Sequence, residues 1–190
     1  MIFAEEMHML DGKKIILRSA RTDEAQMLID YLKTVTGETR FLMSEPDEIN
    51  YTITEEEQFI KEHNESKDSL LMLAFVDGEY AGTCSFESKS GSRRTKHRAG
   101  IGIALFQKYT GFGLGKLMLT RLLTEIKNLG FEQAELTVVG NNEKAYHLYE
   151  SLGFKEYGIL PNANKYDDGT YADDIFMVLK LKKNCQEIQM

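Results

Sequence analysis

The sequence of 190 residues lacks tryptophan and holds only two prolines and two cysteines. With so few prolines, no proline-rich linker divides the chain, and its length fits one domain better than two. Cys84 and Cys185 lie about a hundred residues apart, so they form neither a metal-binding spacing nor a disulfide framework. We predict a single domain over 1–190, with flanking tails at 1–12 and 183–190, in a reducing compartment.

Long hydrophobic runs and an excess of positive charge are also missing. No apolar stretch approaches the length of a membrane span, and residues 1–10 lack the basic segment and apolar run of a signal peptide. The formal net charge is −7, which disfavours nonspecific binding to nucleic acid because phosphates need positive partners. We therefore expect a cytoplasmic protein with no nucleic-acid and no membrane partner. The acidic balance fits attraction of cationic amines or ordinary solubility.

Strand and helix patterns alternate along the chain. Strands are expected at 13–19, 70–76, 79–87, 99–106 and 132–139, with two more between 154 and 181. Helices are expected from 22 or 23 to 35, 54 to 63, 112 to 129 and 141 to 152. The expected caps are Thr22 or Asp23 for the first helix and Thr54 with Glu57 for the second. This order predicts an α/β domain with one mixed sheet.

A glycine-rich turn before the third helix carries the first chemical motif. It consists of Gly111, Phe112, Gly113, Leu114, Gly115 and Lys116. Glycines at alternate positions let backbone N–H groups converge without obstruction by Cβ atoms. The helix N-terminus behind them adds partial positive charge and free donors. The turn therefore predicts a phosphate-binding cradle, although a tight strand-to-helix connection has the same pattern.

Two nucleotide-binding motifs fit this turn poorly. A P-loop needs Ser or Thr after its lysine, whereas Leu117 follows Lys116. A dinucleotide-binding turn needs G-x-G-x-x-G, and here Gly115 comes one residue early. Glu135 lies at about the right distance for a ribose contact, but inside an expected strand rather than at its end.

Residues 142–154 carry the second motif, N-x-x-A-x-x-L-Y-x-x-x-G-F. The apolar positions of this motif share one face of the expected helix. Tyr149 therefore fits a core aromatic residue with a polar hydroxyl as well as it fits a functional residue. On spacing alone, both interpretations stay open.

Together, the two motifs resemble the GNAT superfamily of N-acetyltransferases, over nearly the whole stretch from 13 to 181. Residues 110–115 take the place of the family's pyrophosphate loop, Q/R-x-x-G-x-G/A, with Thr110 where the family has Gln or Arg. The second motif is matched in full by 142–154. The ending at 169–177 is similar to the G-x-Y-x-D…M of the branch near the ribosomal-protein alanine and small-amine acetyltransferases.

The resemblance implies a GNAT-like α/β fold. Its mixed central sheet would have about seven strands, helices on both faces, and strands splayed apart where CoA enters. The implied activity is that of an acyl-CoA-dependent N-acetyltransferase, which moves the acetyl group of acetyl-CoA to a primary amine by direct attack. The acceptor would be a small-molecule amine or a protein N-terminus, and homodimers are common in this family. The alternatives are a catalytically silent acyl-CoA-binding module and a transferase for a longer acyl group.

The resemblance also implies roles for individual residues. The pyrophosphate would lie on the amides of 111–116, and the pantetheine arm would pair with the backbone of Leu105 and Gln107. The Leu105 amide would polarise the thioester carbonyl, and Asn142 would contact the cofactor arm. Tyr149 would protonate the departing thiolate as a general acid. No metal is expected.

The general base is left open by this assignment. Many relatives carry Glu on the strand before the pyrophosphate loop, where this chain has Gly100. Glu87, Asp173 and His97 are candidates, and a water chain or the deprotonated fraction of the amine is an alternative. The acceptor side would be lined by residues 36–51, among them Glu38, Arg40 and Phe41.

Overall fold

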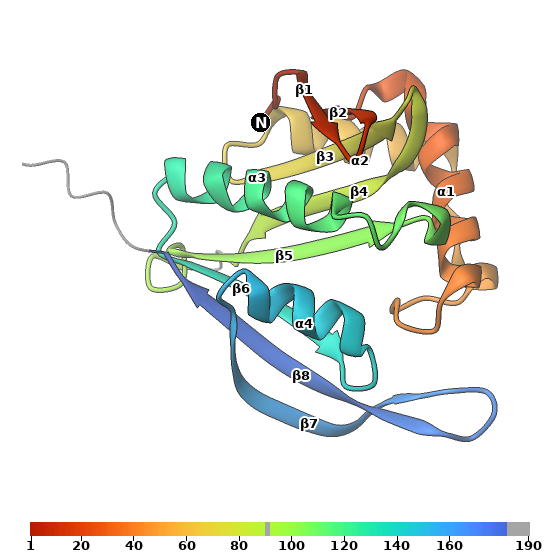
Figure 1. The fold of residues 1–190 in the computed structure, drawn as a ribbon, viewed down its shortest axis with the longest axis vertical. Helices are drawn as coiled ribbons and strands as arrows, with labels where there is room; N and C mark the ends of the chain where they lie inside the picture. The colour runs from red at the N-terminus through yellow and green to blue at the C-terminus, as the bar shows by residue number, and fades with distance from the viewer. Residues whose placement is uncertain (90–91, 182–190) are drawn as a thin grey trace, which may run out of the picture.

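The computed structural model describes residues 1–89 and 92–181 (Figure 1). Its strands are β1 (Glu6–Leu10), β2 (Lys13–Ser19), β3 (Ser69–Val76), β4 (Glu79–Ser88), β5 (Arg98–Leu105), β6 (Gln133–Val139), β7 (Lys155–Lys165) and β8 (Tyr171–Lys180). Its helices are α1 (Ala25–Glu38), α2 (Ile53–Glu65), α3 (Leu114–Asn128) and α4 (Glu143–Ser151), with short 3-10 turns η1 (Thr22–Glu24), η2 (Pro46–Glu48) and η3 (Gln107–Tyr109). The tail expected at 183–190 lies outside the described residues.

A single mixed sheet contains all the described strands, in the order β1-β2-β3-β4-β5-β6-β8-β7. Neighbouring strands are antiparallel except β5 and β6, which run parallel. The predicted α/β class and mixed sheet are therefore confirmed. Within the described ranges the sheet has eight strands where about seven were expected, and the extra strand is β1.

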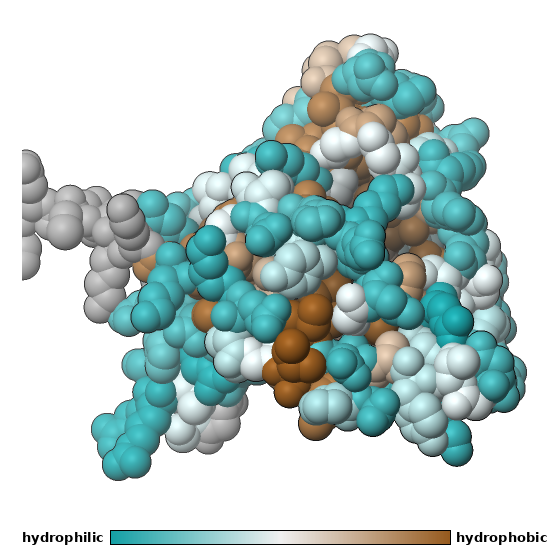
Figure 2. Space-filling model, turned by 60° about the horizontal axis from the view of Figure 1, so that its bottom comes forward, coloured by the Kyte–Doolittle hydropathy of each residue, from teal (hydrophilic) through white to brown (hydrophobic). Residues whose placement is uncertain are grey.

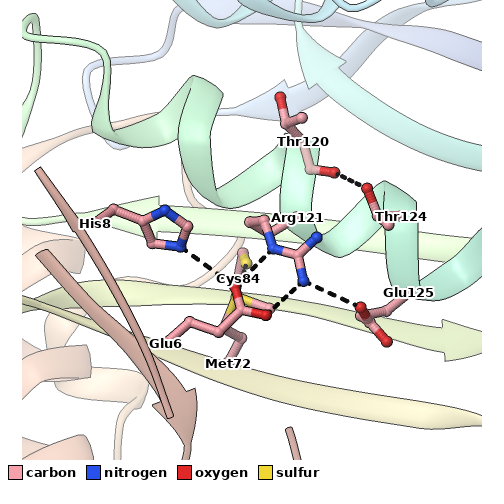
Figure 3. A network of polar contacts seen from close by, with 8 residues as sticks. All are labelled: Glu6, His8, Met72, Cys84, Thr120, Arg121, Thr124 and Glu125. Atoms are coloured by element: carbon pink, nitrogen blue, oxygen red, sulfur yellow. Dashed lines mark hydrogen bonds and ion pairs between the residues drawn. The ribbon is translucent and has the colours of Figure 1, made fainter. Parts of the chain in front are cut away.

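β1 lies in the segment 1–12 that we expected to be a flanking tail, so that expectation is corrected. The strand pairs with β2 through a turn in which Asp11 and Gly12 have φ values of 49° and 74°. Arg121 of α3 donates two hydrogen bonds, at 2.8 and 2.7 Å, to the carboxylate of Glu6 (Figure 3). A short edge strand has a weak sequence signal, and the contact between Glu6 and Arg121 spans 115 residues. Sequence patterns therefore did not reveal β1.

Helices cover both faces of the sheet, as predicted (Figure 1). On one face, α3 packs its buried Met118 and Leu122 against β2, β3 and β4, and α4 joins the same apolar cluster through Tyr149. On the other face, Leu28 of α1 and Ile60 of α2 form a second cluster with alternate residues of β3. Successive side chains of β3 point to opposite faces of the sheet, so this strand contributes to both apolar clusters. None of the helices in the described ranges has the length and apolar character needed to cross a membrane.

The start of α2 differs from the sequence prediction. The hydroxyl of Thr52 accepts a hydrogen bond from the Glu55 amide at 3.2 Å, and the Glu55 carboxylate accepts one from the Thr52 amide at 2.8 Å. This capping box lies two residues before the expected pair of Thr54 and Glu57, which has the same spacing. The first helix is preceded by η1, and neither residue expected to cap α1 does so.

The sheet opens between β5 and β6. These two strands pair only at Arg98↔Gln133, Ala99↔Ala134 and Gly100↔Glu135. Beyond this point, β5 continues along β4 as far as Leu105, and β6 continues along β8 as far as Val139. The facing edges of the two strands diverge, which confirms the splay that the resemblance implied.

The surface on the side of β7 is mainly hydrophilic, with a small group of apolar side chains exposed near the middle of the view (Figure 2). The large apolar residues exposed along β7 are Tyr157, Ile159 and Leu160. β7 is also an end strand of the sheet, and such strands can pair with another chain. The homodimer expected from the resemblance stays a prediction.

Candidate active site

A cleft of about 1220 Å³ begins where β5 and β6 separate. One part of its wall comes from the diverging halves of these strands and from the glycine-rich turn and α4. The other part comes from β4, the C-terminal end of α1 and the loop that follows α1. Because the opening reaches both faces of the sheet, a long ligand held on one side can meet a second molecule from the other.

The glycine-rich turn forms one end of the cleft. Gly111 and Gly113 have φ values of 93° and 96°, a region that other residues rarely adopt. Phe112 packs against the apolar core and Leu114 is buried, so the turn presents backbone to the cleft. The helix begins at Leu114 rather than at Phe112 as predicted, with Gly113 as its N-cap. The first amides of α3 have no acceptor within the helix, which suits them to an anion.

α3 and α4 approach each other closely behind this turn. A Cβ atom at Gly115 would lie 3.3 Å from Cδ2 of Leu148, so glycine permits the contact. Lys116 lines the cleft from the first turn of α3. From α4, Lys144 donates a hydrogen bond to the hydroxyl of Thr110 at 3.0 Å. Motif spacing did not single out Lys144. The sequence did place it in the first turn of the expected helix, and the structure places that turn beside the cleft.

Asn142 is the N-cap of α4 and also lines the cleft. Its side-chain oxygen accepts a hydrogen bond from the Ala145 amide at 3.2 Å. This satisfies one of the free donors at the helix N-terminus. The capping role was not predicted, and it fixes the direction in which α4 leaves the cleft wall.

Tyr149 lies on the cleft wall and in the core at the same time. The side chain is 8% exposed, and its ring makes an edge contact with Phe154 at a centroid distance of 6.0 Å. Burial raises the pKa of the Tyr149 hydroxyl to about 12, because the anionic form loses hydration. The hydroxyl is therefore protonated at neutral pH. The interpretation as a core aromatic residue is confirmed, and the functional role of its hydroxyl stays a prediction.

Leu105 is the last residue of β5 and Gln107 the first of η3, and both line the cleft. The backbone of Gln107 is already engaged within the chain: its amide donates to the Glu38 carboxylate at 2.7 Å, and its carbonyl accepts from the Thr110 amide at 3.1 Å. A cofactor arm that paired with Gln107 would have to replace one of these bonds. Next to Leu105, Gly82 lets β4 approach closely, since a Cβ atom there would lie 2.4 Å from the Ala104 carbonyl oxygen.

The C-terminal end of α1 and the loop after it form another part of the cleft wall. Glu38 and Phe41 line this part, as expected. Arg40, which we also expected there, instead contacts the β7–β8 hairpin: its guanidinium lies 3.6 Å from the centre of the Tyr166 ring and donates to Thr170 at 2.9 Å. Arg40 thus links this loop to the β7–β8 hairpin. Sequence spacing could not distinguish the two sides of an irregular segment.

Gly100, the position at which the resemblance implies Glu in many relatives, lies between two glutamates. Glu135 pairs with it on β6 and Glu87 on β4. Arg98 makes a two-pronged ion pair with Glu135, in which Nη2 lies 2.6 Å from Oε2. Hydrogen bonding from Arg98 lowers the pKa of the Glu135 carboxyl, which makes it a weak proton acceptor. The ion pair between Arg98 and Glu135 joins β5 to β6 within their short paired segment, just before the two strands diverge.

The three candidates for the general base occupy different places. Glu87 lines the cleft and lies 3.2 Å from Nε2 of the buried His63. Asp173 accepts a hydrogen bond from the Asn162 amide at 2.8 Å, within the β7–β8 hairpin. His97 belongs to the segment before β5, where its carbonyl accepts a hydrogen bond from the Glu132 amide. Of the three, Glu87 is the one that the structure brings to the cleft wall.

A comparison with protein families identifies the same region. The family model described as "Acetyltransferase (GNAT) family" matches residues 31–154. The match runs from α1 to the end of the second motif. It therefore contains the glycine-rich turn, the splayed ends of β5 and β6, and α4.

Individual proteins agree with this match. The chain is 38% identical over 79 residues to the ribosomal protein bS18-alanine N-acetyltransferase of Escherichia coli, which covers 42% of the chain and 53% of the relative. The chain thus spans about half the length of this curated relative. The solved structure of a GNAT-family acetyltransferase from Streptococcus pneumoniae has a TM-score of 0.83 and 27% identity, covering 88% and 99% of the two chains.

A second solved structure shares the fold. The protein yncA of Salmonella typhimurium, described with its cofactor acetyl-CoA, has a TM-score of 0.77 and 16% identity. The likeness covers 97% of this chain and 99% of that one. At 16% identity, this comparison shows a shared fold and nothing further.

Proposed function

Because this chain belongs to the GNAT family of acetyltransferases, we propose that it moves the acetyl group of acetyl-CoA to a primary amine by direct attack. The acceptor would be a small molecule or a protein N-terminus. The observation that carries this proposal is the cleft at the β5–β6 splay, which has the glycine-rich turn at one end and Tyr149 on its wall. Cytoplasmic location and the lack of a nucleic-acid partner stay predictions.

The chain's own groups fit the parts of the cofactor. Amides at the start of α3 would bind the diphosphate, because they lack acceptors within the helix and because Phe112 and Leu114 of the turn pack into the core. The edge of β5 from Ile101 to Leu105 has no strand pairing on the β6 side, which leaves room for the pantetheine arm to pair there. When bound, acetyl-CoA supplies a thioester whose acetyl group reacts with amines. The Leu105 amide would donate a hydrogen bond to the carbonyl oxygen of that thioester as negative charge develops.

Tyr149 would assist the departing sulfur. The pKa of about 12 keeps its hydroxyl protonated, which a hydrogen-bond or proton donor requires. The ordinary pKa of a cysteine thiol is about 8.5, so full transfer from this phenol to a free thiolate would be uphill. The hydroxyl therefore contributes most as a hydrogen bond to the sulfur while charge builds on it, and the proton follows as the amine releases its own.

The acceptor amine must lose a proton before or during its attack. Glu87 is the expected base candidate that lies on the cleft wall, and we retain it in that role. Its side chain is 67% exposed, so water molecules can relay a proton between an amine and this carboxylate. An amine that is already deprotonated when it binds would need neither Glu87 nor a relay of water molecules.

A catalytically silent acyl-CoA-binding module is the alternative that one observation favours. The position at which many relatives carry a carboxylate is Gly100, and the neighbouring Glu135 is neutralised by Arg98. Such a module would bind acetyl-CoA with the same cleft and transfer nothing.

Calorimetric titration with acetyl-CoA, with ATP and NAD as controls, tests the cofactor first. Turnover is then measured by release of free thiol, with a panel of small amines, amino acids and N-terminal peptides and with acetyl, propionyl and longer acyl-CoA. Selective binding with turnover supports an acyltransferase, and the preferred chain length distinguishes an acetyltransferase from one for a longer acyl group. Binding without turnover supports the silent module, and no binding of any acyl-CoA contradicts both.

A further inference from the structure

The first position of the family's pyrophosphate loop, residues 110–115, carries no positive charge in this chain. Thr110 occupies that position, and its hydroxyl is neutral. The nearest basic residue before the turn, Lys108, lies 2.9 Å from the Glu79 carboxylate and packs over the Tyr109 ring at 4.7 Å. The Lys108 ammonium is therefore already paired with a carboxylate of the chain. In a chain with a net charge of −7, an anionic ligand needs a local cation.

Lys144 reaches the turn from α4. Its ammonium donates to the Thr110 hydroxyl at 3.0 Å and would lie 4.0 Å from a Cβ atom built on Gly111. The side chain thus spans the gap between α4 and the glycine-rich turn, and it lines the cleft. Among the ion pairs formed by residues 1–89 and 92–181, none involves Lys144. A cation whose bonded partner is a neutral hydroxyl can still take up an anion.

We propose that Lys144 binds the diphosphate of CoA and supplies, from the second motif, the side-chain contact that Thr110 cannot make. This inference rests on the proposed function, since it takes the glycine-rich turn as the diphosphate site. The ammonium would form charge-assisted hydrogen bonds to phosphate oxygens above the amides of α3. Thr110 holds the ammonium in place before the cofactor arrives. The two family motifs are thereby joined by one side chain.

The variant Lys144→Met keeps the length of the side chain and removes its charge. Its affinity for acetyl-CoA, measured by calorimetry on the full chain, is expected to fall roughly tenfold, near the lower end for a hydrogen bond to a charged group, because the Lys144 side chain is exposed. Affinity for acetyl-pantetheine, which lacks the diphosphate, should stay within about twofold. Affinity for dephospho-CoA should fall as much as that for CoA, since it lacks only the 3′-phosphate. The salt dependence of acetyl-CoA binding should weaken because one charge pair is lost.

Two further variants make the test specific. Lys61→Met removes an exposed charge from α2, on the other face of the sheet, and should leave every affinity unchanged. Adding Thr110→Arg to Lys144→Met returns a cation to the turn and should restore most of the lost affinity.

Three results would overturn the proposal. The first is an unchanged affinity of Lys144→Met for acetyl-CoA. The second is an equal loss for acetyl-pantetheine, which would make Lys144 a support of α4 alone. The third is a loss for CoA without one for dephospho-CoA, which would place the ammonium on the 3′-phosphate. Absence of acetyl-CoA binding by the unaltered chain would instead reject the proposed function, and this inference with it.

Discussion

The two parts of the sheet satisfy their backbone groups in different ways. From β1 to β5, each strand pairs with the next over at least five positions. β5 and β6 share only three, and their facing edges then diverge. Paired strands leave no backbone donor or acceptor for a ligand, whereas a divergent pair leaves whole edges to be satisfied from outside. The closed part of the sheet therefore provides stability, and the open part provides the site.

Side-chain packing also differs between the closed part and the open part of the sheet. Behind the closed strands, α3 covers side chains such as Met72 and Phe86, which are fully buried. Along the open edge, β5 runs from Ile101 to Leu105 and is only partly buried or exposed, with a glycine at 102. A substitution in the closed part should thus act on the free energy of unfolding, and one in the open part on ligand binding or turnover. Each of the following predictions tests that division.

The largest expected effect lies in the closed part. Phe86 on β4 is fully buried and makes an edge contact with the Phe131 ring at 5.6 Å. Phe86→Ala should lower the free energy of unfolding by about 3–5 kcal/mol, because it removes apolar contact and leaves a cavity. Urea unfolding monitored by circular dichroism measures this change. Leu160→Ala, on the exposed surface of β7, should change it by less than about 0.5 kcal/mol; similar losses for the two variants would mean that burial of Phe86 is not the source of the loss.

The next effect lies in the open part. Tyr149→Phe should lower turnover roughly a hundredfold, within the range for loss of a positioned proton donor. Affinity for acetyl-CoA should change little, because the hydroxyl acts on the sulfur only as the thioester breaks. The measurement pairs steady-state thiol release with calorimetric binding. Unchanged turnover would remove Tyr149 from the mechanism and leave it as a core aromatic residue.

Regular elements were largely predictable from the sequence because their signals are local. A short, continuous apolar run marked β3, and Asp77-Gly78 marked the turn to β4, in which both residues have positive φ. Gly130 and Gly153, also at positive φ, marked the ends of α3 and α4 as helix-terminating residues do. The splay and the helices on both faces followed from the family resemblance rather than from any one segment.

The parts that could not be predicted depend on contacts between distant residues. β1 is fixed by Arg121, and the Gln107 amide is taken by Glu38, 69 residues away. Arg40 contacts a hairpin that lies more than a hundred residues further along the chain. Sequence patterns give the period of an element but not which side chain from another element will reach it. The candidate site was therefore predicted as a set of backbone positions more completely than as a set of side-chain contacts.

A smaller effect is expected at the glycine-rich turn. Gly113 has a φ of 96°, and a Cβ atom there would lie 3.7 Å from the Leu10 side chain. Space is thus available, but the backbone conformation is strained for alanine by about 1–2 kcal/mol. Gly113→Ala should weaken acetyl-CoA binding several-fold by turning the amides of α3, and thermal unfolding should shift down by a few degrees.

Gly100→Ala is the matched control for that change. A Cβ atom at Gly100 would come within 2.6 Å only of Cε of Lys89, the end of a flexible and exposed side chain. The lysine can move aside, so stability and affinity should both stay near those of the unaltered chain. If Gly100→Ala weakened binding as much as Gly113→Ala, the effect would belong to the cleft in general and not to the conformation of the turn.

The smallest expected effect concerns the ion pair that holds β1. Hydrogen bonding from Arg121 lowers the pKa of the Glu6 carboxyl below its usual 4.5, so ionised Glu6 stabilises the folded chain. This contribution is fully present above the unfolded-state pKa, and it is lost as the pH falls through the lower, folded-state value. Because Glu6 is partly exposed, the contribution at neutral pH should be only about 0.2–1 kcal/mol.

A double-mutant cycle of Glu6→Gln and Arg121→Gln isolates that contribution. Urea unfolding at pH 7 should give a coupling energy of this size, and repetition at successively lower pH should show it shrinking once the pH drops below 4.5. Acetyl-CoA affinity at neutral pH should be the same in all four chains, because the pair joins β1 to α3 and neither residue lines the cleft (Figure 3). A coupling energy that grew on acidification would mean that protonated Glu6 is the stabilising form, and a change in affinity would mean that the closed part and the site are not independent.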